Sequence, residues 1–235
     1  MAAPMDPAVP HRYADVTVVL PALDEEQALP RVLAELPAVG QVIVVDNGST
    51  DRTAEVARAQ GATVLFEPRR GYGLACKAGI AHAAARGARV LVILDADHSD
   101  HPEELSLLVD PILEDRADMV LGERTSRAEP GSLMPQQRLG NMLATALIAR
   151  RTGHRYRDMG PFRALRMESL LALEMEDDSY GWNVEMQMKA VRHGLRIQEI
   201  AVGYRPRIGQ SKVSGTVKGT VKAGLKILWS TWRYR

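Results

Sequence analysis

The chain has 235 residues, a length that suits one domain, and its 30 Lys and Arg against 29 Asp and Glu give a formal net charge of +1. This near-balance argues against a protein that coats nucleic acid, and 46% hydrophobic with 25% charged residues is typical of a packed globular protein. A single cysteine, Cys76, excludes an internal disulfide and a cysteine-based zinc site, so we expect the reducing environment of the cytoplasm.

The first 14 residues are expected to form a disordered lead. Prolines at positions 4, 7 and 10 interrupt them, and they lack the basic start and the apolar run of a signal peptide. No run elsewhere approaches the roughly 18 consecutive apolar residues that a membrane-spanning helix needs. We therefore expect a protein that does not cross a membrane.

Short apolar strands alternate with helices through the first half of the chain. The pattern predicts strands at 16–20, 42–45, 62–66, 90–94 and 119–121, and helices at 24–36, 54–59, 74–86 and from Pro102 onward. Strands that are apolar throughout and alternate with helices are typical of a parallel sheet covered on both faces. The sequence thus predicts an α/β fold in which helices flank a mostly parallel central sheet.

The second half of the chain is less regular. We expect helices at 137–151 and 182–192 and a strand at 195–204, while the polarity of segment 158–163 indicates a site rather than a core. Because no repeat or linker divides the chain, residues 15–214 are predicted to form a single domain.

The C-terminal segment concentrates positive charge. Residues 200–235 carry eight Lys and Arg and no acidic residue, which leaves 22 basic against 29 acidic residues, a net charge of −7, in the rest of the chain. Residues 215–235 are predicted to form a basic amphipathic helix with Val217, Val221 and Leu225 on one face. Such a helix suits either a membrane interface or packing against the sheet.

Carboxylates follow three of the predicted strands, at Glu25, at Asp46, and at Asp95 and Asp97. Each alone could cap the next helix, but ligands of open parallel sheets bind beyond the carboxyl ends of the strands, where these side chains would meet. Carboxylates in one crevice repel one another unless a cation offsets them, and oxygen ligands favour Mg²⁺ or Mn²⁺ over zinc. Because such an ion usually completes its shell with substrate phosphates, we expect a nucleotide diphosphate as ligand.

Two other nucleotide-binding folds lack their motifs. The first strand runs into Pro21-Ala-Leu-Asp24 instead of Gly-x-Gly-x-x-Gly, and no Gly-x-x-x-x-Gly-Lys-[Ser/Thr] occurs. Both the dinucleotide-binding and the P-loop interpretations are therefore excluded.

An ordered set of motifs across residues 16–225 resembles the inverting family 2 glycosyltransferases, particularly the dolichol-phosphate mannosyltransferase-like, polyprenyl-phosphate branch. The motifs are Pro21-Ala-Leu-Asp-Glu25, Val44-Val-Asp-Asn-Gly-Ser-Thr-Asp51, Arg70-Gly-Tyr-Gly73, Asp95-Ala-Asp97, Gly122-Glu-Arg124 and the stretch from Arg205 to Lys212. The resemblance implies a GT-A fold, in which an Asp-x-Asp motif holds Mg²⁺ or Mn²⁺ against the diphosphate of a nucleotide sugar.

The resemblance also implies roles on the donor side. Nucleotide-sugar binding falls to Pro21, Ala22, Glu25, Asp46, Asp95, Arg205, Arg207, Ser211 and Lys212. Asp46 would contact the base or ribose, and Asp97 would be the principal metal ligand, assisted by Asp95 and Ser99. Asp24 departs from the pattern, because relatives usually carry Asn there.

On the acceptor side, the resemblance implies that Arg124 and Arg138 hold the acceptor head. A phosphate acceptor is already ionised near neutral pH and needs no general base, whereas a hydroxyl acceptor needs a carboxylate, for which Asp177, Asp178 and Glu185 are candidates. Asp158 and Arg163 flank Gly160-Pro161, and their position suggests that they shape the acceptor side.

These observations lead to a prediction with two alternatives. We expect a metal-dependent inverting glycosyltransferase that moves a hexose from a nucleotide diphosphate sugar, of the GDP-mannose or UDP-glucose type, to a polyprenyl phosphate at the cytoplasmic membrane face. One alternative is transfer to a soluble hydroxyl acceptor, and the other is a non-catalytic nucleotide-sugar-binding domain. A nucleic-acid partner is not expected, because the basic segment lacks interleaved aromatic residues.

Overall fold

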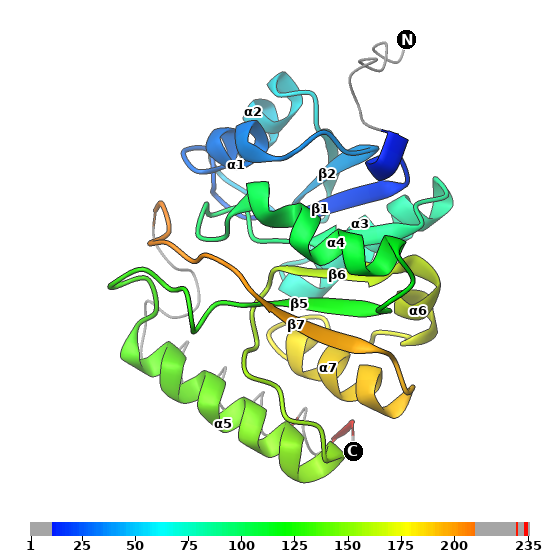
Figure 1. Cartoon of the computed structure of the whole chain (residues 1–235). Helices are drawn as coiled ribbons and strands as arrows, with labels where there is room; N and C mark the ends of the chain where they lie inside the picture. The colour runs from blue at the N-terminus through cyan, green and yellow to red at the C-terminus, as the bar shows by residue number, and fades with distance from the viewer. Residues whose placement is uncertain (1–10, 210–228, 230–232, 235) are drawn as a thin grey trace.

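A seven-stranded sheet lies at the centre of the computed structural model, which describes residues 11–209, 229, 233 and 234 (Figure 1). The strands are β1 (Val16–Ala22), β2 (Gln41–Asp46), β3 (Thr63–Phe66), β4 (Val90–Ile93), β5 (Met119–Glu123), β6 (Arg163–Arg166) and β7 (Ile197–Ala201). Their order across the sheet is β3-β2-β1-β4-β6-β5-β7. Strand β6 runs antiparallel to both of its neighbours, and the other pairs are parallel. The predicted α/β architecture is thus confirmed.

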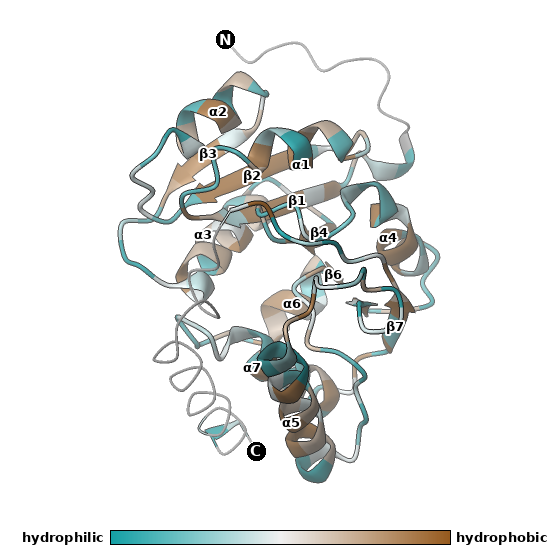
Figure 2. Ribbon diagram, turned by 90° about the vertical axis from the view of Figure 1, so that its left-hand side faces the viewer, coloured by the Kyte–Doolittle hydropathy of each residue, from teal (hydrophilic) through white to brown (hydrophobic). Residues whose placement is uncertain are grey.

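Helices cover both faces of this sheet, and Figure 2 shows α3 and α4 on opposite sides of it. The helices are η1 (His11–Tyr13), α1 (Leu29–Glu35), α2 (Thr53–Ala59), α3 (Tyr72–Ala85), η2 (Pro102–Glu104), α4 (Leu105–Leu113), α5 (Pro135–Thr152), α6 (Met167–Ala172) and α7 (Trp182–Arg192). Along β1, Val18 and Leu20 join the apolar cluster under α1 and α4, and Val19 joins the cluster under α3 and α7. The alternation follows from the two-residue period of a strand.

Four elements differ from the sequence-based expectation. The helix expected from Asp24 begins only at Leu29, because Asp24 has a φ of 53° and Glu25 starts a turn, its carbonyl accepting the Ala28 N–H. Strand β6 and helix α6 were not expected, since the arginines at both ends of the four-residue β6 mask its apolar middle. The strand expected at 195–204 is shorter, at 197–201.

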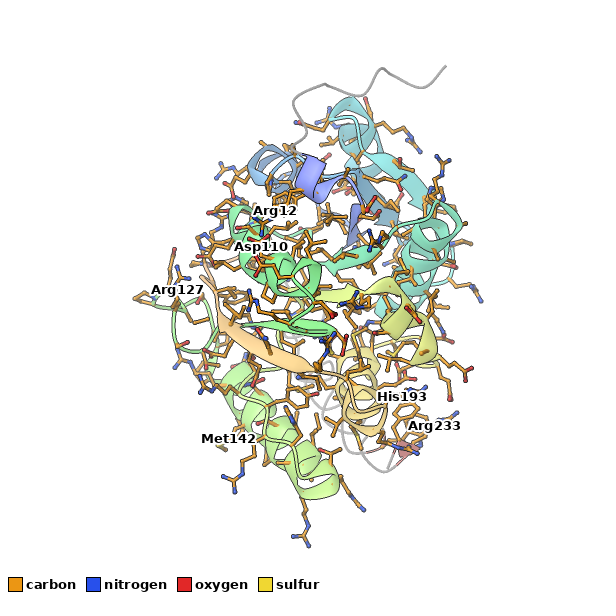
Figure 3. All side chains as sticks on the ribbon, turned by 45° about the vertical axis from the view of Figure 1, so that its right-hand side comes forward. Arg12, Asp110, Arg127, Met142, His193 and Arg233 are labelled. Carbon is orange, nitrogen blue, oxygen red and sulfur yellow. The ribbon has the colours of Figure 1, made fainter. Side chains whose placement is uncertain are left out.

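The two ends of the described chain pack against the domain. Within the predicted disordered lead, residues 11–13 instead form η1, and Arg12 lies beside Asp110 of α4 at 3.1 Å (Figure 3). The predicted C-terminal helix at 215–235 falls mostly outside the described residues. At its end, Tyr234 is buried in the α3 and α7 cluster, and Arg233 pairs with Glu176. The C-terminus therefore returns to the domain at Tyr234.

Across the described residues, we find no helix with both the length and the apolar character needed to span a membrane.

Candidate active site

A cavity of about 420 Å³ opens at the carboxyl ends of β1, β2 and β4. Its walls come from those strand ends, the start of α3, the loop before α7 and the segment after β7. The lining residues are Pro21, Ala22, Leu23, Glu25, Asn47, Arg70, Gly71, Tyr72, Ala75, Asp95, Ala96, Asp97, Ser179, Tyr180 and Arg207. Neighbouring parallel strands end at the same edge of a sheet, and for this reason segments distant in sequence meet here. We call this space the donor cavity, after the nucleotide-sugar donor predicted to bind several of its lining residues.

Most of the residues predicted for nucleotide binding line the donor cavity, but Asp46 does not. The Oδ1 atom of Asp46 accepts the Ser49 N–H at 2.8 Å, so its carboxylate caps the turn after β2. Asn47 lines the cavity in its place. The Asn47 amide donates to the Glu67 carbonyl at 3.0 Å and accepts the Gly71 N–H at 2.8 Å. Asn47 thus ties the turn after β2 to the segment after β3.

The glycines of the Arg70-Gly-Tyr-Gly73 motif allow two backbones to touch. A Cβ at Gly71 would lie 2.2 Å from the Asp178 carbonyl oxygen, and one at Gly73 would lie 2.0 Å from that of Asp177. The Leu74 N–H donates to the Asp178 carbonyl at 3.2 Å across the same contact. Only glycine permits this approach, which fixes the loop before α7 as a wall of the cavity.

The Asp-x-Asp motif follows β4 and faces the cavity. Burial, and then the neighbouring Asp97 carboxylate, raise the pKa of Asp95 to about 7. The Oδ2 atom of Asp97 lies 3.1 Å from an Arg207 guanidinium nitrogen, and a second Arg207 nitrogen is 2.9 Å from Glu25. Arg207 therefore bridges two carboxylates of the donor cavity.

Asp95 and Asp97 fit a hard divalent ion. A set of three or more His, Cys, Asp or Glu side chains positioned for a metal does not occur among the described residues. Mg²⁺ and Mn²⁺ can use one or two carboxylates and complete their shell with water and substrate phosphates. Burial, and then the Asp97 carboxylate, raise the pKa of Asp95, and a bound cation would offset both effects. The Ser99 hydroxyl donates to Asp97 Oδ1, so Ser99 orients that carboxylate and lies outside the cavity lining.

Arg205 lies behind the Asp-x-Asp loop, not in the donor cavity. Its backbone N–H donates to the Ser99 carbonyl at 2.9 Å, and its guanidinium donates to the His98 carbonyl at 2.8 Å. The same guanidinium pairs with Glu35 of α1 at 2.5 Å. Arg205 thus braces the loop of the Asp-x-Asp motif and is not among the residues that line the donor cavity. Its predicted contact with a diphosphate stays a prediction. Ser211 and Lys212, predicted for the same task, lie outside the described residues.

A second cavity, of about 310 Å³, lies between β5, α5 and the loop before β6, and we call it the acceptor cavity. It is lined by Arg124, Thr125, Leu133, Gln137, Arg138, Asn141, Met142, Thr145, Arg157 and Asp158. The two arginines predicted for the acceptor head, Arg124 and Arg138, therefore meet in one cavity. Arg157 lines the same cavity.

The Arg124 guanidinium is held rigidly in the acceptor cavity. Its Nε and one terminal nitrogen donate to the two Asp158 oxygens at 2.7 and 2.9 Å, and its carbon lies 4.8 Å from the centre of the Tyr204 ring. Burial alone would raise the pKa of Asp158, but the Arg124 charge holds that pKa below its usual value. Such bidentate pairs fix geometry as well as adding energy.

The carboxylates offered as general bases face neither cavity. Buried Glu185 accepts the Glu176 and Asp177 N–H groups at 2.7 and 2.6 Å and pairs with Lys189 at 2.8 Å. The Asp178 side chain is 61% exposed and pairs with Lys77. Asp177 accepts the Ser179 N–H at 2.8 Å. None of the three carboxylates is among the lining residues of either described cavity, and each holds a contact within the loop before α7 or with a neighbouring lysine. A general base at Glu185 or Asp178 stays a prediction.

Several lining residues were not predicted from the sequence. Asn47 and Arg70 follow predicted strands, so their position at the carboxyl edge was a signal for them. Ser179 and Tyr180 reach the donor cavity, and Arg157 the acceptor cavity, only through contacts between segments far apart in the chain. No local pattern marks these three.

Comparison with known proteins identifies relatives over most of the chain. Residues 17–173 match the model of Glycosyl transferase family 2. An uncharacterized glycosyltransferase of Mycobacterium tuberculosis is 42% identical over 212 residues, which cover 88% of this chain and 94% of the relative. The undecaprenyl-phosphate mannosyltransferase of Micrococcus luteus is 33% identical over 243 residues, covering 94% of this chain and 98% of the relative.

A solved structure gives the same fold. Glucosyl-3-phosphoglycerate synthase from Mycobacterium tuberculosis, in complex with Mn²⁺, UDP and glucosyl-3-phosphoglycerate, aligns with a TM-score of 0.73 at 23% identity, over 95% of this chain and 82% of that one. Together, the family match, the relatives and the fold confirm the resemblance drawn from the sequence motifs. The chain belongs to glycosyl transferase family 2, is similar to its polyprenyl-phosphate branch, and is a glycosyltransferase with a GT-A-like α/β fold.

Proposed function

We propose that this glycosyltransferase moves a hexose, with inversion, from a nucleotide diphosphate sugar to the phosphate of a polyprenyl phosphate at the cytoplasmic membrane face. The observation that carries the proposal is the acceptor cavity. Arg124, Arg138 and Arg157 line it together, and Asp158, the one carboxylate among its lining residues, is paired with Arg124.

The donor is proposed to bind in the donor cavity, with its base near Pro21, Ala22 and Asn47 and its diphosphate near Asp97 and Arg207. Mg²⁺ or Mn²⁺ at Asp95 and Asp97 would stabilise the negative charge that builds on the departing nucleotide diphosphate. Arg207 would then exchange its carboxylate partners for phosphate oxygens, because a guanidinium binds phosphate equally well. The Mn²⁺ and UDP in the solved relative support this arrangement.

The acceptor supplies its own nucleophile in this proposal. A phosphate oxygen attacks the anomeric carbon, the bond from that carbon to the nucleotide phosphate breaks, and the electron pair leaves with the nucleotide diphosphate. The phosphate monoester is ionised because its second pKa is about 6, so no proton has to be removed. The enzyme's part is to position the phosphate, which the Arg124 and Asp158 pair supports.

The surface of α5 supports a lipid as the remainder of the acceptor. Leu139, Met142 and Leu143 expose 53%, 58% and 53% of their surface, and Met142 also lines the acceptor cavity (Figure 3). A cationic cavity bordered by an apolar helix face matches a phosphate that carries a hydrocarbon chain. The name of the Micrococcus luteus relative, an undecaprenyl-phosphate mannosyltransferase, points to the same acceptor class.

A donor screen tests this proposal. The full chain is incubated with Mn²⁺ and either GDP-mannose or UDP-glucose, in the presence or absence of undecaprenyl phosphate in detergent. We expect one donor to release nucleotide diphosphate together with labelled sugar in the organic extract, and only when the lipid is present. Release that 3-phosphoglycerate stimulates and the lipid does not would support the soluble-acceptor alternative instead.

A further inference from the structure

Arg163, the first residue of β6, is a buried cation without an acidic partner among the described residues. Its side chain is 0% exposed. It donates to the Pro161 carbonyl at 3.2 Å and to the Gly160 carbonyl, and a further guanidinium nitrogen lies 3.5 Å from Met186 Sδ. All of its described hydrogen bonds thus go to backbone carbonyls and a sulfur atom.

Burying such a group is costly. Burial lowers the pKa of the Arg163 guanidinium, the direction expected for a charge removed from water. A buried charge without an ion-pair partner is destabilising, so an apolar residue at this place would be expected on grounds of stability alone. Buried groups that lower stability in this way concentrate at sites that need a fixed geometry.

The loop that Arg163 holds is the loop that positions Arg124. Asp158, at its start, pairs with Arg124 through two hydrogen bonds. Gly160 packs against the same pair, because a Cβ there would lie 3.0 Å from Arg124 Nε and 3.1 Å from Asp158 Oδ2. Gly160 thus links the two groups, because its carbonyl binds Arg163 while its Cα lies close to Arg124 and Asp158.

Other bonds keep the loop folded without Arg163. The Gln187 amide donates to the Asp158 carbonyl at 3.0 Å, and the Met159 N–H donates to Asn141 at 2.8 Å. These contacts anchor the first half of the loop. The second half, at Gly160 and Pro161, relies on Arg163 for the carbonyl contacts described above.

We propose that Arg163 is a positioning residue, which fixes the Gly160-Pro161 carbonyls and through them the Asp158 and Arg124 pair that receives the acceptor phosphate. The acceptor part of this inference rests on the proposed function. The positioning of Arg124 does not, and it can be measured separately.

The first test measures the environment of the Arg124 side chain directly. In a heteronuclear NMR spectrum of the full chain, the Arg124 Nε–H signal is assigned by its loss in Arg124→Lys. We expect Arg163→Met to shift that signal and to speed its exchange with solvent about tenfold, because the hydrogen bond to Asp158 loosens. The matched control is Arg166→Met on the same strand, whose partners Asp115 and Asp118 lie away from both cavities. An unchanged Arg124 signal in folded Arg163→Met overturns the proposal.

The second test distinguishes an effect on acceptor use from an effect on donor binding. With farnesyl phosphate as a short acceptor, we expect Arg163→Met to raise the acceptor KM or lower kcat by about tenfold, while the Kd for nucleotide diphosphate with Mn²⁺ changes less than twofold. Arg163→Lys keeps the charge and a hydrogen-bond donor group, so it should recover part of the loss. It replaces Arg163→Met in both tests if Arg163→Met does not fold. Equal losses on the donor and acceptor sides would mean a general structural role and would refute positioning. Should the wild type not use farnesyl phosphate, the proposed function fails and the NMR result still decides the role of Arg163.

Discussion

The donor and acceptor cavities are built in different ways. The donor cavity lies on the edge of a parallel sheet, and its carboxylates, Asp95, Asp97 and Glu25, sit in turns directly after strands. The acceptor cavity is made by α5, the end of β5 and the loop before β6, and its charged groups are mainly arginines. The contrast indicates a division of labour, in which one cavity is suited to a cation with its diphosphate and the other to an anion.

Removing Asp97, the proposed metal ligand, should have the largest effect on the donor cavity. We expect Asp97→Ala to lower transfer at least about a thousandfold, because stabilisation of the leaving group is lost, while the thermal unfolding curve stays cooperative. Turnover assays and calorimetry with Mn²⁺ check both parts. Glu103→Ala, at an exposed site near the same loop, is the control and should keep its activity. Full activity of Asp97→Ala, or of the wild type in excess chelator, would contradict the metal assignment.

Replacing Arg124, whose guanidinium is fixed by Asp158, should affect use of the acceptor and not binding of the donor. We expect Arg124→Lys, which cannot pair with both Asp158 oxygens at once, to lower kcat/KM for a polyprenyl phosphate about a hundredfold. The Kd for nucleotide diphosphate, measured by calorimetry, should stay within about twofold of the wild type, because Arg124 does not line the donor cavity. A matching loss of nucleotide affinity would show that the two cavities do not act separately.

The burial of Asp95 beside Asp97 predicts a pH dependence of stability for the metal-free protein. The pKa of Asp95 is raised to about 7 from a usual value near 3.8, so the folded protein holds a proton that the unfolded chain releases between these values. This contribution to stability is therefore present below about pH 4 and is lost as the pH rises towards 7, by an amount on the order of a few kcal/mol.

Denaturant unfolding of the wild type and of Asp95→Asn over this range measures the effect. The variant should lack the Asp95 contribution, so the difference in unfolding free energy between the two proteins should change with pH. Parallel curves for the two proteins would rule out the raised pKa.

The apolar face beside the acceptor cavity should matter only for a lipid acceptor at a membrane. We expect the triple variant Leu139→Ser, Met142→Ser and Leu143→Ser to reduce transfer to undecaprenyl phosphate in vesicles about tenfold, because these side chains are exposed and bury their surface only on binding. Leu171→Ser on α6, where the side chain is 50% exposed, is the matched control. Equal rates for the triple variant and the control would show that these residues of α5 do not contribute to lipid binding.

The smallest effect on chemistry is expected at Glu185. Its carboxylate holds the loop at 176–177 and pairs with Lys189, so Glu185→Gln should lower stability while kcat falls less than about threefold. A general base would instead contribute about a hundredfold or more. Steady-state kinetics of this variant distinguish the two roles, and a loss of that size would restore Glu185 as a base.

The difference between the cavities also explains how much the sequence could predict. The donor cavity follows from local patterns, since Pro21, Asp95 and Asp97 each directly end or follow an apolar strand, and the sheet brings such positions together. The sequence did not indicate that Arg205 would pair with Glu35 on a distant helix, because this contact depends on the tertiary fold.

The acceptor cavity was less predictable. Arg124 and Arg138 came from motif resemblance, and Asp158 and Arg163 were assigned to the acceptor side only from their position around Gly160-Pro161. Arg157 and the antiparallel strand β6 were not indicated by any local pattern. Tertiary contacts of this kind have no signal within a short window of sequence.

The central claim is that the acceptor's own phosphate is the nucleophile, and a pair of acceptors that differ only in that group tests it most directly. With Mn²⁺ and the preferred nucleotide sugar, transfer to farnesyl phosphate is compared with transfer to farnesol by following nucleotide diphosphate release and the labelled product. The two-cavity account predicts product with farnesyl phosphate and none above background with farnesol. Transfer to farnesol at a comparable rate, or to a soluble hydroxyl compound in preference to farnesyl phosphate, would contradict it.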